Sequence, residues 1–121
     1  MPERIKYAAV GCGGMGRRHL RGMARLSRSS FNNLELAAVC DLNQENASFL
    51  ADEAHELTGE RPKVYASIEE MVRENPDLRA ADVTTDAGSH HTVATACLEA
   101  GLNVLCEKPL AITVRGCNRV I

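Results

Sequence analysis

Residues 5–16 read Ile-Lys-Tyr-Ala-Ala-Val-Gly-Cys-Gly-Gly-Met-Gly, a short apolar run that ends in the pattern G-x-G-x-x-G. In this pattern Gly11 lets the chain turn tightly out of a strand, and Gly13, which has no Cβ, lets the backbone approach a pyrophosphate. Gly16 lets the helix that follows pack close to the sheet. The stretch therefore predicts a strand, a glycine loop and a helix, with a phosphate-binding turn between strand and helix.

A second apolar run, 34–40, leads directly into Asp41, which lies 25 residues after Gly16. The helix N-terminus offers unpaired N–H groups and a partial positive charge to phosphates, and the Asp41 carboxylate can accept hydrogen bonds from ribose hydroxyls. Two alternatives are a tight strand–helix turn without a ligand and a methyltransferase domain, which also has a glycine-rich first loop and an acid after its second strand. The spacing of Gly13 and Gly16 favours a dinucleotide.

The bulk composition suits one domain with an aliphatic core, because 45% of the 121 residues are hydrophobic but only 3% are aromatic. The net charge of −2, from 14 basic and 16 acidic residues, gives no electrostatic case for a nucleic-acid partner. The arginines within 17–28 predict a solvated face on the first helix, with a phosphate contact by Arg17 or Arg18 as the lesser alternative.

Five cysteines occur, and none forms a C-x-x-C pair. Their odd number and apolar surroundings are typical of a reduced protein in which cysteine packs as a small hydrophobe, so we expect a cytoplasmic location. No apolar run approaches the roughly 18 residues of a membrane span, and no long apolar stretch precedes Gly11 as a secretory signal would. We therefore expect no membrane partner.

Strand patterns alternate with helix patterns along the whole chain. Right-handed crossovers between such units give a parallel sheet with helices on both faces, so the predicted fold class is α/β, a doubly wound parallel sheet of the Rossmann type in a single domain over 1–121. Within 80–84, Asp82 must find donors, lie near an edge or weaken the strand. The predicted strands are 4–10, 34–40, 63–66, 80–84 and 103–106, and the predicted helices are 14–27, 43–57, 67–75 and 89–100, with a fifth from 113.

The tripeptide Glu107-Lys108-Pro109 follows the last predicted strand, where open α/β sheets bind their ligands. A lysine there can hold a hydroxyl oxygen, orient a ribose, or transfer a proton when desolvated. Pro109 restricts Lys108 to an extended backbone, which limits where the ammonium points. Taken alone, the tripeptide is more typical of a surface salt bridge followed by a turn.

Several further segments occur in order and at the right intervals, and with them the chain resembles the Gfo/Idh/MocA oxidoreductases over essentially its whole length. The most specific part is 94–113. The segments that carry the resemblance are Gly11–Gly16 with His19, Asp41, Asn75-Pro76, Thr85, His90, Leu98–Gly101 and Val104–Ala111.

The resemblance implies an NAD(P)-dependent dehydrogenase domain that serves hydride transfer at a sugar, polyol or related hydroxyl or carbonyl centre. Lys108 would be the catalytic residue and would reach both cofactor and substrate. Asp41 would favour NAD, since it repels a 2′-phosphate, with NADP as the alternative. A cis bond before Pro109 is typical of the family. The implied cofactor-binding residues are Gly11, Gly13, Gly14, Met15, Gly16, Asp41, Thr84, Thr85, His90, Glu107 and Lys108.

The spacing of the histidines gives no indication of a metal site. His90 and His91 are adjacent, and no cysteine or carboxylate has ligand spacing around them. His19, three residues after Gly16 on the first helix, predicts a hydrogen-bonded packing role rather than catalysis.

Two departures from the family pattern bear on function. Thr85 is followed by Asp86 where the family usually has proline, which predicts a looser loop and added negative charge near the cofactor. The family's second domain, which supplies most substrate contacts, is absent from 1–121, so we expect a fragment or a truncated product that is inactive alone and associates with itself as a homo-oligomer. The alternative is a non-catalytic NAD(P)-binding module or redox sensor.

Overall fold

The computed structural model describes residues 4–121, and its sheet is built from strands that alternate strictly with helices. Each predicted strand and helix is confirmed, with boundaries that differ by no more than one residue at either end. The one addition is the 3₁₀ turn η1, which precedes α4. The elements are β1 (Ile5–Val10), α1 (Gly14–Ser27), β2 (Leu34–Cys40), α2 (Gln44–Thr58), β3 (Lys63–Tyr65), α3 (Ile68–Glu74), β4 (Ala80–Val83), η1 (Ala87–Ser89), α4 (His90–Glu99), β5 (Asn103–Cys106) and α5 (Val114–Val120).

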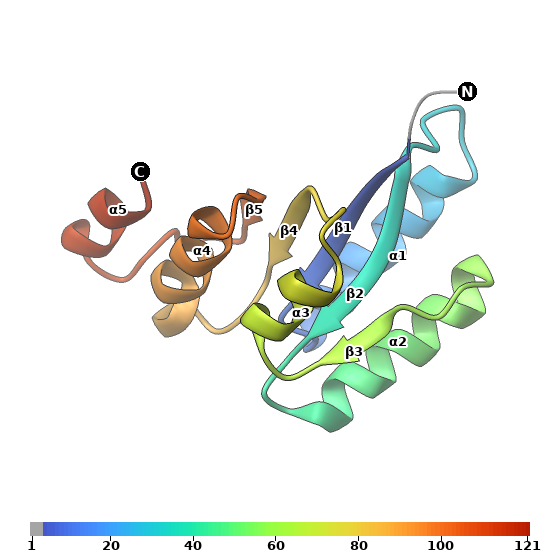
Figure 1. Cartoon of the computed structure of the whole chain (residues 1–121), viewed down its shortest axis with the longest axis horizontal. Coiled ribbons are helices and arrows are strands. Elements are labelled where there is room, and N and C mark those ends of the chain that lie inside the picture. Colours follow the sequence, from blue (N-terminus) through green and yellow to red (C-terminus); the bar gives the residue numbers. More distant parts are fainter. Residues whose placement is uncertain (1–3) are drawn as a thin grey trace.

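All five strands form one parallel sheet in the order β3-β2-β1-β4-β5. The chain builds outward from β1 to β3 and then returns to the other side of β1 (Figure 1). The order of strands therefore reverses between β1 and β4, and this switch point is where open α/β sheets hold ligands. The predicted doubly wound fold is confirmed.

Alternate residues of the strands point to opposite faces of the sheet, and each face carries its own buried apolar layer. Ala8 and Val10 lie with Met71 of α3 and Cys97 of α4 on one face of the sheet. Ala9 lies on the opposite face, in a layer with Val39 of β2, Leu20 of α1 and residues of α2 that include Leu50, Ala51 and Ala54. Small aliphatic side chains dominate both layers, so the helices pack close to the sheet, as the low aromatic content predicts.

Local signals set the ends of the helices. The side chains of Asn43, Ser67 and Thr113 accept backbone N–H groups at the starts of α2, α3 and α5. Gly59 ends α2 in the left-handed conformation, where a residue without Cβ is favoured. Within residues 4–121, no helix is both long and apolar enough to cross a membrane.

The α1 side of the sheet is left partly uncovered at the β5 edge. Helix α5 packs against α4 at the far end of the molecule and does not return over this face (Figure 1). Leu105 points to the α1 side, as its register partner Asp82 does, and it is 56% exposed. A shallow hollow of about 240 Å³ extends from Leu105 to Tyr7 and Met23.

Candidate dinucleotide site

A cleft of about 450 Å³ lies at the carboxyl ends of β1, β2 and β4, at the switch point of the sheet. The glycine loop forms one wall through Gly11–Gly13, and the ends of β2 and β4 supply Asp41 and 84–86. The sequence predicts these segments as ligand-binding from positions far apart in the chain, and the fold brings them to one place.

The fold requires glycine at positions 11 and 16, whether or not a ligand is bound. Gly11 has φ +98°, and a Cβ there would lie 2.6 Å from the backbone N of Thr85. A Cβ on Gly16 would lie 2.5 Å from the backbone O of Gly11. These distances are shorter than any real side-chain contact, so the strand, the loop and α1 can meet only because both residues are glycine.

Gly13 and the start of α1 differ from these two glycines, because they face open space. A Cβ on Gly13 or Gly14 would meet no atom within 4 Å. Gly13 is the N-cap of α1, no side chain caps the helix, and its first turn holds no acidic residue. The backbone N–H groups at this helix start are therefore available to an anion, and the partial positive charge of the helix favours one.

Asp41 joins the glycine loop to the loop that follows β2. One carboxylate oxygen accepts the backbone N–H of Cys12 at 2.9 Å, and the other accepts the backbone N–H of Asn43 at 2.9 Å. Each oxygen keeps a lone pair for a further donor, since a carboxylate oxygen can accept two hydrogen bonds. The structure thus holds the carboxylate rigidly on the cleft wall.

Thr84 and Thr85 lie on the opposite wall and have different partners. The Thr84 hydroxyl donates to the backbone O of Gly11 at 2.8 Å and so braces the loop. The Thr85 hydroxyl is buried and has no hydrogen-bond partner within residues 4–121. A buried hydroxyl without a partner is costly, and this one belongs to a residue of the cleft wall.

The loop after β4 is ordered by Asp86 rather than by the proline usual in the family. The Ser89 backbone N–H and hydroxyl both donate to the Asp86 backbone O, at 3.0 Å each, and the hydroxyl also lies 3.1 Å from Asp86 Oδ1. These bonds form the turn η1 and replace the constraint of a proline ring. The Asp86 carboxylate lines the cleft and brings the negative charge that the sequence predicts.

His90 is 2% exposed and lies between two loops. Its Nε2 is 2.7 Å from the backbone O of Thr85, and its Nδ1 is hydrogen-bonded to the backbone O of Pro109. The imidazole therefore ties the β4 loop to the Glu107-Lys108-Pro109 segment. Both ring nitrogens have partners in the protein, and a cofactor contact by His90 stays a prediction.

A second cluster joins α1, β4 and the end of β5. His19 Nδ1 lies 2.8 Å from Asp82 Oδ2, and its Nε2 lies 3.0 Å from Glu107 Oε2. The predicted hydrogen-bonded role of His19 is confirmed, and Asp82 finds the partner that a buried carboxylate needs. Sequence reasoning missed that Glu107 joins the same cluster, because the three residues are 63 and 88 positions apart along the chain.

Burial and charge act on this cluster in opposite directions. Burial lowers the pKa of His19, but hydrogen bonds and charge from Asp82 and Glu107 outweigh it and raise the pKa above its ordinary value. Burial raises the pKa of Asp82, although His19 opposes this. The Lys108 backbone N–H and then His19 lower the pKa of Glu107. The arrangement favours a protonated imidazole.

Lys108 is exposed at the end of this segment, and the peptide bond between Lys108 and Pro109 is cis, as predicted. Its backbone N–H donates to Glu107 Oε1 at 3.0 Å. No hydrogen bond or ion pair engages the Lys108 ammonium within the described part of the chain, so the charge is available to a ligand.

The basic face of α1 points toward α2. The Arg17 guanidinium lies 4.5 Å above the centre of the Phe49 ring, and Arg17 Nε is 3.4 Å from Glu53 Oε2. Arg21 pairs with the same carboxylate at 2.9 Å. Arg17 is therefore engaged between the helices rather than free for a phosphate contact, and the solvated face of the other arginines stays a prediction.

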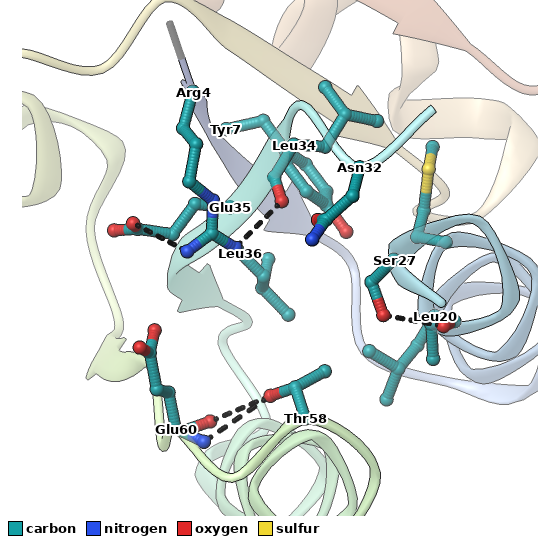
Figure 2. Close-up of a pocket in the computed structure, with 12 residues that line it drawn as sticks. Arg4, Tyr7, Leu20, Ser27, Asn32, Leu34, Glu35, Leu36, Thr58 and Glu60 are labelled. Carbon is teal, nitrogen blue, oxygen red and sulfur yellow. Dashed lines mark hydrogen bonds and ion pairs between the residues drawn. The ribbon is translucent and has the colours of Figure 1, made fainter. Parts of the chain in front are cut away.

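Another hollow, of about 240 Å³, lies at the opposite end of the sheet, between the ends of α1 and α2 (Figure 2). Three of its polar side chains have partners in the protein: Arg4 binds the backbone O of Leu34, Ser27 binds that of Ala24, and Thr58 binds that of Ala54. It lacks the glycine loop and the open helix start of the cleft. We therefore assign it a packing role.

Within 4–121, no group of three or more His, Cys, Asp or Glu residues is arranged so that it could hold a metal ion. All five cysteines are free. Burial, together with the nearby Asp41 charge, raises the pKa of Cys12 in the glycine loop to about 12. Its thiol therefore packs as a small hydrophobe rather than serving as a reactive group.

Comparison with known proteins places the chain among oxidoreductases. Inositol 2-dehydrogenase of Pseudomonas fluorescens (strain SBW25) is 34% identical over 117 residues, which are 97% of this chain and 32% of that relative. The structure of GenD2 from gentamicin A biosynthesis in complex with NAD has a TM-score of 0.82 and 28% identity, and covers 99% of this chain and 31% of that one.

The structure of myo-inositol dehydrogenase from Lactobacillus casei in complex with NAD(H) and myo-inositol has a TM-score of 0.81 and 27% identity, and covers 97% of this chain and 32% of that one. The chain thus spans about a third of the length of these relatives. The Gfo/Idh/MocA family model, described as "Oxidoreductase family, NAD-binding Rossmann fold", matches residues 5–121. The chain therefore belongs to this family of NAD-binding oxidoreductases.

Proposed function

We propose that residues 5–121 bind NAD in the cleft at the switch point and serve as the coenzyme half of a dehydrogenase. The observation that carries this is the start of α1, where uncapped backbone N–H groups and the open space beside Gly13 face the cleft. The pyrophosphate would lie along 11–16, with Gly14 and Met15 contributing backbone N–H groups. The unpartnered hydroxyl of Thr85 supports a ligand on the facing wall.

NAD is the proposed coenzyme rather than NADP. Asp41 holds a carboxylate on the cleft wall, and both of its oxygens are fixed by backbone N–H groups. It would accept hydrogen bonds from the ribose hydroxyls and repel a 2′-phosphate. Asp86 adds a second negative charge to the same cleft.

The proposed substrate class is a sugar or polyol, since relatives include inositol 2-dehydrogenases. Nicotinamide supplies the hydride chemistry when it is bound. Lys108 is the proposed catalytic residue, because its ammonium is exposed beside the end of β5 and can hold a hydroxyl oxygen or a ribose. Glu107 would orient the Lys108 backbone, and Thr84 would brace the glycine loop.

The direct test is a titration of the chain with NADH, followed by nicotinamide fluorescence. We expect saturable binding of NADH and weaker binding of NADPH. S-adenosylmethionine, added as a competitor, should leave the NADH signal unchanged. Displacement of NADH by S-adenosylmethionine would contradict the proposal and favour a methyltransferase-like site.

The 121-residue chain should catalyse no measurable oxidation of inositol or glucose with NAD. The chain spans a third of its relatives' length, and the described residues offer one catalytic candidate, Lys108. The measurement is the rise in absorbance at the NADH band, with a full-length inositol 2-dehydrogenase as positive control. Turnover by the chain alone would contradict it, whereas NADH binding without turnover also fits the alternative of a non-catalytic NAD(P)-binding module.

We further propose that the chain forms homo-oligomers through the β5 edge. Leu105 is exposed on the uncovered face, and β5 is an edge strand. Exposed apolar edges favour association. Sedimentation should show dimers or larger species that dissociate in Leu105→Lys, whereas Phe31→Lys, which alters a residue in the loop between α1 and β2, should leave them intact. A wild-type monomer at all concentrations would contradict this proposal.

The cytoplasmic location of the protein stays a prediction.

A further inference from the structure

The His19 cluster lies beside the segment that carries Lys108, yet none of its side chains lines the cleft wall described above. The His19 side chain is 23% exposed, Asp82 is 6% exposed and Glu107 is 26% exposed. Three ionisable groups from three elements are thus held in contact with limited access to water. Such an arrangement is costly unless the charges compensate one another.

The hydrogen bonds determine which protonation state fits. Each ring nitrogen of His19 faces a carboxylate oxygen, at 2.8 and 3.0 Å. Two ionised carboxylates can only accept, so both nitrogens must donate, and an imidazole donates from both only when it is protonated. A neutral imidazole would leave one lone pair facing a carboxylate. The geometry therefore requires the imidazolium whenever both carboxylates are ionised.

The cluster reaches Lys108 through Glu107. One oxygen of Glu107 faces His19, and the other accepts the backbone N–H of Lys108 at 3.0 Å. The backbone N–H of Glu107 itself donates to the backbone O of Val83 at 2.9 Å. The orientation of this carboxylate therefore depends on whether His19 donates a hydrogen bond to it. The carboxylate in turn fixes the backbone at the start of the Lys108 segment.

We propose that His19 is a positioning residue: as an imidazolium that donates to both Asp82 and Glu107, it holds the carboxylate that binds the Lys108 backbone. The consequence for coenzyme rests on the proposed function, but the coupling itself is a property of the free chain. Loss of the His19 proton releases one of the two carboxylates and loosens the Lys108 backbone.

Other titratable groups face the same cluster. Tyr7 of β1 lies near Asp82, and burial of the ring first and then the Asp82 charge raise the pKa of the phenol. Cys106 of β5 lies near both carboxylates, and burial first and then their charges raise the pKa of its thiol. Lys108 contributes a positive charge beside Glu107. Tyr7 and Cys106 therefore stay neutral through neutral pH, so the charge of the cluster is set by His19, Asp82 and Glu107.

The test is an NMR titration of the free chain that follows the His19 ring and the Lys108 backbone amide together. We expect a His19 midpoint above 6.5, its ordinary value, and a Lys108 amide shift with the same midpoint. In His19→Gln that amide response should vanish, whereas His55→Gln, which removes an exposed imidazole from α2, should preserve it. Glu107→Gln, which changes the group between His19 and the Lys108 backbone, should also abolish the Lys108 amide response.

Coenzyme affinity gives the second readout. NADH affinity should fall about fivefold as pH rises through the His19 midpoint, and should be flat with pH in His19→Gln. An unchanged Lys108 amide response in His19→Gln, or a His19 midpoint below 6.5, would overturn the proposal. Absence of any NADH binding by the wild-type chain would overturn the proposed function alone, because the NMR titration is made without coenzyme.

Discussion

Gly11→Ala should lower the free energy of unfolding by about 3 kcal/mol, the sum of roughly 1–2 kcal/mol for a left-handed backbone and a similar cost of overpacking. Gly11 has φ +98°, and its added Cβ would meet the backbone of Thr84 and Thr85 at 2.6 to 2.9 Å. Backbone atoms at the end of β4 cannot move aside as a flexible side chain would. The glycine loop and β4 would have to separate, which opens the cleft.

Gly59→Ala is the matched control for this substitution. Gly59 has φ +85°, but a Cβ there would meet no atom within 4 Å. Gly59→Ala should therefore lower the free energy of unfolding only by the cost of the left-handed backbone, about 1 kcal/mol. Urea unfolding curves of the two variants measure the difference. Equal losses would mean that the contact between the loop and β4 adds nothing to stability.

Asp41→Asn should reduce the preference for NADH over NADPH about 30-fold. Removing a full negative charge near a 2′-phosphate changes its interaction energy by about 2 kcal/mol at a partly exposed site. The amide also cannot accept both the Cys12 and the Asn43 N–H groups, so affinity for both coenzymes falls. The ratio of the two dissociation constants is the cleaner readout, since both coenzymes share the pyrophosphate.

Glu45→Gln provides the control for Asp41→Asn. Glu45 is an exposed carboxylate in the first turn of α2, a few residues after Asp41. Its removal changes the net charge by the same amount and should leave the ratio within about twofold. Equal changes in both variants would show that general charge, rather than a ribose contact by Asp41, sets the preference.

The fold could be predicted from the sequence because its signals are local. Strand runs, helix caps such as Asn43 and Ser67, and the glycine pattern each act over a few residues. The turn η1 could not be predicted, because it depends on the exchange of a proline for Asp86 and on bonds from Ser89.

The candidate site could be predicted only in part, for the same physical reason. The glycine loop and Asp41 follow strand ends, so their positions at one edge of the sheet follow from the topology. The partners of His19 could not be predicted from the sequence, because they are set by how α1 packs across β4 and β5. The sequence shows that the Asp82 carboxylate conflicts with a buried strand, but it does not show that His19 is the residue that binds it.

Gly13→Ala shows whether the uncapped start of α1 binds the coenzyme pyrophosphate. A Cβ there meets no protein atom within 4 Å, so stability should change by no more than about 1 kcal/mol. The same Cβ would occupy the space proposed for the pyrophosphate. Calorimetric titration with NADH should show binding by the wild-type chain at millimolar coenzyme or below, and at least tenfold weaker binding by a folded Gly13→Ala. Equal heats and affinities for the two proteins, or no heat from the wild-type chain, would contradict the account.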